Sequence, residues 1–107
     1  MKRGEIRYYE FASPDKRRPV LLLSRDTAIR QLNDITVAPI TSTIRNLPTE
    51  VPLDETDGMP KRCAINLDHL QTVPKHRIGD RLTEIGAAKL DAVERALLFA
   101  LGFRDEV

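Results

Sequence analysis

Residues 16–24 read Lys-Arg-Arg-Pro-Val-Leu-Leu-Leu-Ser, and this stretch decides the fold. Its apolar run, residues 20–23, is short and is bounded by Pro19 and Ser24, which is typical of a buried strand rather than a helix. Three cations precede the run, and Pro19 biases Arg18 towards an extended backbone. A guanidinium at the end of a rigid core strand could bind a phosphate through two parallel hydrogen bonds. The alternative is that the three cations are solvated charges that flank a strand.

The length predicts one domain over residues 1–107, with room for one hydrophobic core. The chain holds 17 Lys and Arg against 16 Asp and Glu, so its net charge does not indicate a nucleic-acid partner. The charges are unevenly distributed, however. Residues 1–30 hold eight Lys and Arg against four Asp and Glu, whereas residues 31–60 hold one against five. Such a chain can present a basic face, and therefore a local anion site, without a high pI.

Cysteine and histidine usage narrows the possible chemistry. Cys63 is the single cysteine, so no intrachain disulfide can form, which fits a reducing cytoplasm. The sequence has no long apolar segment, and we expect neither a signal peptide nor a membrane span. His69 and His76 are seven residues apart with Pro74 between them, and no cysteine or carboxylate completes a common metal-ligand spacing. We therefore expect neither a bound metal nor a cofactor.

Periodicity predicts many short strands followed by one clear helix. Residues 87–101 place leucines and Val93 on one face and charges on the other, which is typical of an amphipathic helix. Pro39 cannot donate to a ladder, so we expect its strand to lie at a sheet edge or to contain a bulge. The pattern favours a mainly β fold with helices, a small barrel with the C-terminal amphipathic α-helix packed against it. Strands are predicted over residues 5–11, 20–23, 35–40, 49–53 and 63–67, further extended segments at 71–73 and 81–85, a short helix at 25–32, and turns at 12–16 and 54–61.

Polar residues follow or precede several of the predicted strands, and neighbouring strand ends can converge in a small barrel. Such a set suits cleavage of RNA by its own ribose 2′-OH. A base takes the 2′-OH proton, an acid protonates the leaving 5′-oxygen, and a cation stabilises the charge that develops on phosphorus. The alternative is that these residues make local turn and cap hydrogen bonds, or lie on the surface. The residues are Arg18, Thr41, Ser42, Asp68 and His69.

Five blocks of sequence, in order, resemble those of the MazF/PemK (Kid-type) toxins of bacterial type II toxin–antitoxin systems. The closing segment Leu101-Gly102 matches as well, so the resemblance covers nearly the whole chain. The blocks are Arg-Gly-Glu-Ile at 3–6, Arg-Pro-Val-Leu-Leu-Leu-Ser at 18–24, Val-Ala-Pro-Ile-Thr-Ser at 37–42, Leu-Pro-Thr-Glu-Val at 47–51, and Asn-Leu-Asp-His-Leu-Gln-Thr-Val at 66–73.

This resemblance implies an SH3-like small barrel of the CcdB/MazF type and a homodimer. It also implies a sequence-selective, metal-independent endoribonuclease of the bacterial cytoplasm that cleaves single-stranded RNA (mRNA) to 2′,3′-cyclic phosphate and 5′-OH ends. A cognate antitoxin would lay an acidic segment over the same groove, because a site built for phosphates also attracts carboxylates.

Carried over by position, Arg18 and Thr41 match the family's recurrent active-site pair. Arg18 would act as acid or stabilise the charge on phosphorus, and Thr41 would orient the phosphate. Asp68 matches a carboxylate proposed as base in the Kid branch, but Asn66 stands where that branch has an arginine, which shifts the weight to Arg18. The residues expected to contact RNA are Lys16, Arg17, Ser42, His69 and Gln71.

Two other functions remain open for this barrel. One is a CcdB-like toxin that poisons gyrase without nuclease activity, and the other is a non-catalytic barrel that binds a partner. CcdB-like chains carry a C-terminal tryptophan, and this chain has no tryptophan. The loop at 12–16 is shorter than in many relatives, so the resemblance predicts an open groove. Base selection is expected to depend on residues 43–47 and 54–61.

Overall fold

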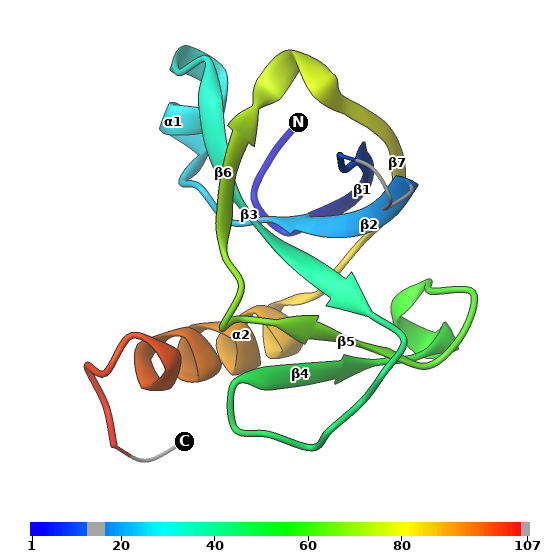
Figure 1. The fold of residues 1–107 in the computed structure, drawn as a ribbon, viewed down its shortest axis with the longest axis vertical. Coiled ribbons are helices and arrows are strands. Elements are labelled where there is room, and N and C mark those ends of the chain that lie inside the picture. Colours follow the sequence, from blue (N-terminus) through cyan, green and yellow to red (C-terminus); the bar gives the residue numbers. More distant parts are fainter. Residues whose placement is uncertain (13–16, 106–107) are drawn as a thin grey trace.

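The computed structural model describes residues 1–12 and 17–105, and these form a curled antiparallel sheet with two helices (Figure 1). The mainly β fold with a C-terminal helix that the sequence predicted is confirmed. Its strands are β1 (Glu5–Glu10), β2 (Arg17–Leu22), β3 (Asp34–Thr41), β4 (Glu50–Leu53), β5 (Cys63–Asn66), β6 (Gln71–Pro74) and β7 (Ile78–Glu84). The helices are α1 (Asp26–Gln31) and α2 (Ala87–Ala100), and the 3-10 turns are η1 (Glu55–Asp57) and η2 (Lys75–Arg77).

The strand β3 is the centre of the sheet. The strand order is β4-β5-β3-β2-β1-β7, and β6 pairs with β3 beside that path. One flank of β3 pairs with β2, while the other changes partner along its length. That flank pairs with β6 as far as Val37 and with β5 from Ile40 onward. Figure 1 shows the result: β6 runs along one half of β3, and the β4–β5 pair crosses the other half.

Pro39 predicted either a sheet edge or a bulge for its strand. The edge is wrong because β3 is an interior strand, and the register of β3 with β2 shows no bulge at Pro39. Thr36 directs its backbone oxygen to β2, where it accepts from Leu23 N (3.0 Å), and alternate residues turn to opposite flanks. The nitrogen of Pro39 therefore faces the other flank, in the interval between the end of the β6 pairing and the start of the β5 pairing. A residue without an N–H is tolerated there because the ladder is interrupted at that point.

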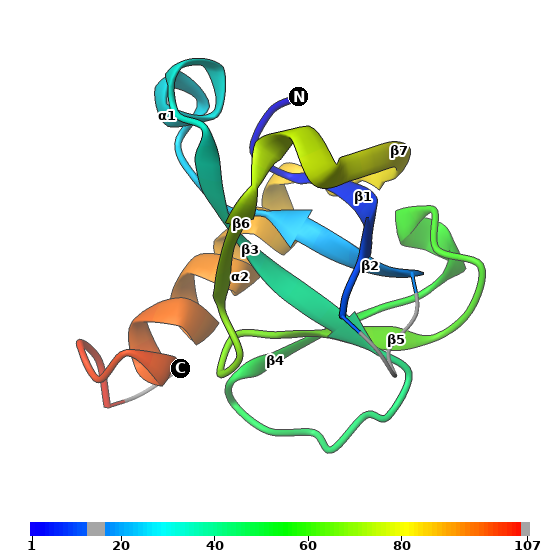
Figure 2. The ribbon, with the colours of Figure 1, turned by 45° about the horizontal axis from the view of Figure 1, so that its top comes forward.

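Alternate residues of β2 enter two separate cores, which explains the unbroken apolar run of the opening stretch. Val20 and Leu22 pack into one core together with Val37, and Ile29 of α1 also contributes to this core. Leu21 packs into a second core, which β3, β4, β5 and α2 share. Figure 2 shows α2 behind β3, where it closes this second core. A strand that is buried on both faces needs apolar residues at every position rather than alternate ones.

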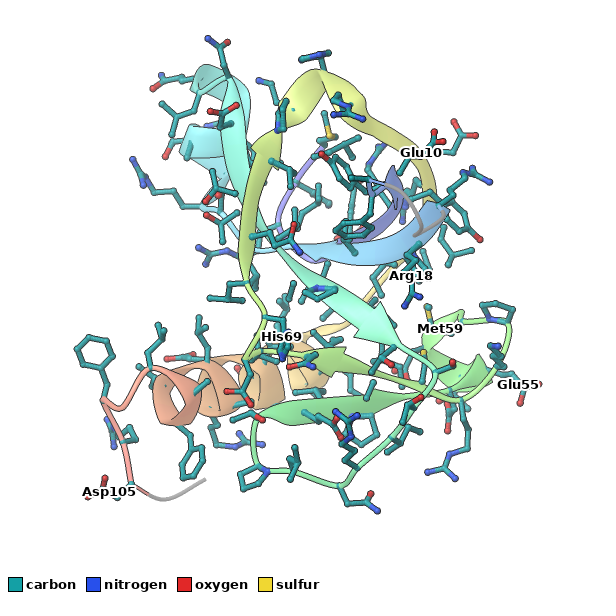
Figure 3. All side chains as sticks on the ribbon, in the orientation of Figure 1. Glu10, Arg18, Glu55, Met59, His69 and Asp105 are labelled. Carbon is teal, nitrogen blue, oxygen red and sulfur yellow. The ribbon has the colours of Figure 1, made fainter. Side chains whose placement is uncertain are left out.

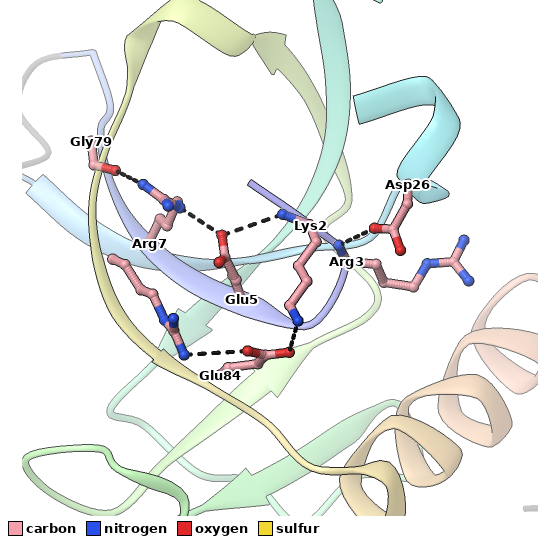
Figure 4. Close-up of polar contacts among 8 residues, drawn as sticks. Lys2, Arg3, Glu5, Arg7, Asp26, Gly79 and Glu84 are labelled. Atoms are coloured by element: carbon pink, nitrogen blue, oxygen red, sulfur yellow. Dashed lines mark hydrogen bonds and ion pairs between the residues drawn. The ribbon is translucent and has the colours of Figure 1, made fainter. Parts of the chain in front are cut away.

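A buried carboxylate fixes the start of β1 (Figure 4). The Glu5 side chain is only 8 % exposed, and its Oε1 accepts from Arg7 Nε (2.8 Å) and from the backbone N–H of Lys2 (3.3 Å). Arg7 also donates to the carbonyl oxygen of Gly79 in β7 (3.0 Å). Nearby, the more exposed Glu84 pairs with Lys2 and with Arg81, both at 3.2 Å. Glu5 therefore joins β1 to the N-terminal turn and, through Arg7, to β7.

The predicted element boundaries agree with the structure to within one residue except at the starts of two strands. The strand β2 begins at Arg17 instead of residue 20, and β7 begins at Ile78 instead of residue 81. Residues 79–81 are exposed and polar, so hydrophobic periodicity does not reveal them as strand. The turn η2 was not predicted. Residues 13–16 of the turn predicted at 12–16 lie outside the described residues. Among the described residues, no helix is long and apolar enough to cross a membrane.

Candidate active site

Arg18 and Thr41 meet at the open ends of β2 and β3. The register pairs Val20 with Pro39, and its continuation by two residues sets Arg18 opposite Thr41. Both residues line one pocket of about 260 Å³, and Ser42 lines it as well. Figure 3 shows Arg18 and Met59 at this end of β3, where the loop that follows η1 approaches the strand ends. The structure thus brings together three of the residues that the sequence predicted for the site.

The Thr41 side chain is oriented by its own turn. The backbone N–H of Thr43 donates to Thr41 Oγ1 at 3.0 Å. This local hydrogen bond is the alternative role that the sequence left open for Thr41, and it is observed. It uses an acceptor lone pair of the hydroxyl and leaves the hydroxyl proton available to donate. Thr41 is half-buried at the pocket and can therefore serve as a positioned donor.

The loop on the far side of the pocket is fixed by its own hydrogen bonds. Asp54 caps η1 in a reciprocal capping box, and Gly58 follows with φ +91°, where a Cβ would collide with the Thr83 side chain. Thr83 Oγ1 also donates to the carbonyl oxygen of Asp57 (3.0 Å), which ties the loop to β7. These contacts hold the residues that follow, Met59, Pro60 and Lys61, against the pocket.

Arg17 lies beside the pocket without lining it. Its guanidinium carbon stands 4.0 Å from the centroid of the Tyr8 ring, and Tyr8 itself lines the pocket. Arg17 also pairs with the exposed Asp80 at 3.8 Å. The cation therefore stacks on a pocket wall and remains accessible to solvent. Lys16, the other cation expected to contact RNA, lies outside the described residues.

Asp68 and His69 lie in the turn between β5 and β6, away from this pocket. Thr49 Oγ1 donates to Asp68 Oδ2 (2.7 Å), and the Asp68 N–H donates to Asn66 Oδ1 (2.9 Å). His69 is exposed, and Figure 3 shows it across β3 from Arg18. Neither residue lines the pocket that contains Arg18 and Thr41.

Gln71 is the first residue of β6 and does not line the pocket. It pairs with Val37 of β3, and directly opposed residues share a face of the sheet. Because residues two apart in a strand also share a face, Gln71 lies on the face of β3 that carries Pro39 and Thr41. Val37, on the same face between Gln71 and Pro39, is buried in the core, so the exposed Gln71 side chain stands apart from the pocket.

Cys63 lines the pocket, but its thiol is poorly reactive. Burial, and then the negative charge of Asp57, raise the pKa of its thiol above the usual value. A thiol that stays protonated at neutral pH is a poor nucleophile. Cys63 is 4 % exposed and packs in the core shared with α2, as expected of a small apolar residue.

Comparison with known proteins places this geometry in a family. The family model described as "PemK-like, MazF-like toxin of type II toxin-antitoxin system" matches residues 2–101. The chain belongs to this family. Over 92 residues it is 37 % identical to Endoribonuclease MazF3 of Mycobacterium tuberculosis, and the aligned region covers 86 % of this chain and 89 % of that protein. It is 41 % identical over 100 residues to the probable endoribonuclease MazF5 of the same organism, covering 92 % and 91 %.

A solved mycobacterial endoribonuclease, in complex with its cognate antitoxin, superposes with a TM-score of 0.86 at 27 % identity and covers 97 % of each chain. The resemblance to the MazF/PemK toxins and the MazF-type fold are thus confirmed. The matches favour an endoribonuclease toxin over the gyrase-directed and non-catalytic alternatives.

Sequence reasoning missed part of the pocket wall. Residues 54–61 were expected to take part in base selection, but nothing in the sequence placed Tyr8, Leu82 and Met59 together at one pocket. Tyr8 and Leu82 come from β1 and β7, which neighbour each other only because the chain returns to β1 after the five intervening strands. A pairing between the first and last strands has no local sequence signal.

Proposed function

We propose that this chain cleaves single-stranded RNA at the pocket that contains Arg18 and Thr41, without a metal ion. The ribose 2′-oxygen attacks the adjacent phosphorus, so that an O2′–P bond forms and the P–O5′ bond breaks. The 2′-OH gives up its proton, the departing 5′-oxygen gains one, and the products carry a 2′,3′-cyclic phosphate and a 5′-OH. The observation that carries the proposal is the convergence of Arg18 and Thr41 at one pocket in a chain of the MazF family.

Arg18 supplies the electrostatic part of the mechanism. Its planar fork can donate two hydrogen bonds to the non-bridging phosphate oxygens, whose charge increases as the 2′-oxygen attacks. The Thr41 hydroxyl, oriented by Thr43, donates to the same phosphate group. Removal of one such preorganised donor typically lowers kcat by about 10² to 10³.

Asp68 is the family's candidate for the general base, and the geometry gives it less weight than Arg18. A base must come within about 2.6–3.2 Å of the proton that it removes, or act through one water. Asp68 is held by Thr49 in the turn beyond β5 and does not line the pocket. We therefore expect Asp68 and His69 to contact the RNA beside the scissile phosphate, as we expect of Arg17, Ser42 and Gln71.

The proposal includes two protein partners. We propose a homodimer, because the C-terminal turn exposes Leu101 (55 %) and Phe103 (74 %), and exposed large apolar side chains favour association. We also propose a cognate antitoxin, since the mycobacterial relative was solved with its own. An acidic antitoxin segment would compete with RNA for Arg18. The site of action would be the bacterial cytoplasm, which holds the mRNA.

Incubation of the purified protein with mixed-sequence single-stranded RNA in EDTA tests the function. We expect discrete fragments with 2′,3′-cyclic phosphate ends. Arg18→Ala should lower the rate at least 100-fold, and Asp68→Asn should lower it less. Arg95→Ala, which removes an exposed cation from α2, is the matched control and should cleave normally. Intact RNA with well-folded protein would refute the proposal, and undiminished cleavage by Arg18→Ala would refute the site.

A further inference from the structure

The pocket that Arg18 lines is larger than a phosphate group requires. Its walls are largely apolar, and its volume is about 260 Å³. Pockets of about 300–1,000 Å³ bury whole drug-sized ligands, so this one suits a single heterocycle. The wall residues are the ring of Tyr8 and the side chains of Pro19, Ile40, Met59, Pro60 and Leu82.

We propose that this pocket holds the base of one of the two nucleotides that flank the scissile phosphate. We further propose that Lys61 makes the pocket select bases that carry a carbonyl oxygen at C4 of a pyrimidine or C6 of a purine, namely uracil and guanine. The inference rests on the RNA cleavage proposed above and adds its substrate preference. The position follows from Arg18 and Thr41, which line the same pocket and would hold the phosphate to which that nucleotide is attached.

The polar groups of the pocket favour a base that accepts hydrogen bonds. Arg18 and Lys61 can only donate, and the described lining residues include no carboxylate and no carboxamide. Guanine presents its O6 and N7 acceptors, and uracil presents carbonyl oxygens. At the position of guanine O6 and uracil O4, adenine and cytosine present an amino donor, for which an ammonium group offers no acceptor. The side-chain acceptors along the wall are the hydroxyls of Tyr8, Thr41 and Ser42, and Thr41 Oγ1 already accepts from Thr43.

The wall is also rigid enough to discriminate. Arg17 stands over the Tyr8 ring at 4.0 Å, and Met59 is only 4 % exposed. Gly58 and the Asp54 capping box fix the loop that carries Lys61, and Pro60 restricts the backbone immediately before it. Selection between bases requires such a preformed wall, since a flexible loop would adapt to any base.

Cleavage-site mapping tests the preference. Wild-type and Lys61→Met proteins would be incubated with mixed-sequence single-stranded RNA in EDTA, and all 5′-OH ends sequenced. In the wild type we expect uracil or guanine at one of the two positions that flank the cut. In Lys61→Met, which keeps the apolar stem and loses the ammonium, we expect discrimination against adenine and cytosine to fall about tenfold. Arg62→Met removes the adjacent exposed cation, which does not line the pocket, and should keep the wild-type preference.

Cleavage with no base preference at either flanking position would overturn the inference, and so would an unchanged preference in Lys61→Met. In both cases the RNA cleavage proposed above would stand, so the two failures are distinguishable.

Nucleotide binding gives a readout that does not depend on catalysis. NMR titration with the 3′-monophosphates and the 5′-monophosphates of uridine, guanosine, adenosine and cytidine would place a phosphate at Arg18 and a base on either side of it. We expect the uridine or guanosine nucleotide to bind about tenfold more tightly than the other two, with shifts at the Met59 methyl group, and Lys61→Met to remove the difference. Equal affinities for all four, or no shift at Met59, would refute the pocket assignment. Selective binding without any RNA cleavage would support the pocket and refute the proposed catalysis.

Discussion

Replacement of Glu5 by glutamine tests the buried ion pair that fixes the start of β1. The Glu5 side chain is 8 % exposed and that of Arg7 is 21 % exposed, so water can replace little of their interaction. Removal of one partner from a buried pair costs about 3–5 kcal/mol. Glutamine keeps one acceptor oxygen, and Arg7 keeps its bond to Gly79, so we expect a smaller loss of about 1–2 kcal/mol in the free energy of unfolding at pH 7.

Urea unfolding at one fixed protein concentration measures this loss, because a dimer's stability depends on concentration. With a slope of about 2 kcal/mol per M, the middle of the usual range in urea, the midpoint should fall by roughly 0.5–1 M. Glu84→Gln is the matched control. Its side chain is 31 % exposed, and ion pairs at such sites contribute about 0–1 kcal/mol, so we expect a shift of at most half that of Glu5→Gln.

The pH dependence separates the charge of Glu5 from its packing. Burial raises the pKa of the Glu5 carboxyl, but the Arg7 hydrogen bond and charge, the Lys2 N–H and the N-terminal ammonium together hold it below the usual value of 4.5. A group whose pKa is lower in the folded state stabilises the fold above its unfolded pKa, and this contribution is lost as the pH falls through the folded pKa.

The stability difference between wild type and Glu5→Gln should therefore be complete at pH 7 and should shrink below about pH 4.5. A difference of equal size at pH 7 and at pH 3 would show that the charge plays no part. An equal loss in Glu84→Gln would refute the argument from burial.

Three further substitutions test the parts that surround the active site. Gly58→Ala should destabilise the protein by about 1–3 kcal/mol in urea unfolding, because φ is +91° and the new Cβ would collide with Thr83; a stability equal to wild type would show that the loop adapts. Thr41→Ser should keep most of the RNA cleavage and Thr41→Val should lose about 10²-fold or more, since only serine keeps a hydroxyl that Thr43 can orient; equal rates in the two variants would exclude the hydroxyl from the reaction. Pro39→Ala should lower the free energy of unfolding by about 0.4–1 kcal/mol through the more flexible unfolded chain, and a gain in stability would show that the new N–H finds a partner on the flank of β3.

The short strands, the C-terminal helix and the family could be predicted from the sequence because their signals are local. The run at residues 20–23 predicts a buried strand since each residue must be apolar when both faces enter a core. The leucines of α2 follow the helical period. The position of β3 could not be predicted from Pro39, because a proline excludes one backbone hydrogen bond and says nothing about which flank of an interior strand lacks a partner.

Part of the candidate site could be predicted from the sequence because its signal is also local, at the ends of two neighbouring strands. Arg18 and Thr41 are strand-end residues on neighbouring strands, so one register brings them together. Asp68 also follows a strand, but the turn after β5 directs it to Thr49, which no strand pattern indicates. The Tyr8 and Leu82 walls depend on the pairing of β1 with β7, which is set by the whole chain.

The partner change along β3 explains why the site lies where it does. Between Val37 and Ile40 the pairing partner on one flank of β3 changes from β6 to β5. The first half of β3 contributes to the core with Val20 and Leu22, and the second half contributes to the core with α2. The residues of the second half that face away from the core with α2, Pro39 and Thr41, are therefore left half-buried, although they belong to an interior strand. A groove at such a place combines a rigid backbone with accessible side chains, which holds functional groups in a fixed geometry. Arg18 reaches this place because β2 runs three residues beyond its outermost pair with β3, Val20 and Pro39, so the cation emerges where the sheet opens.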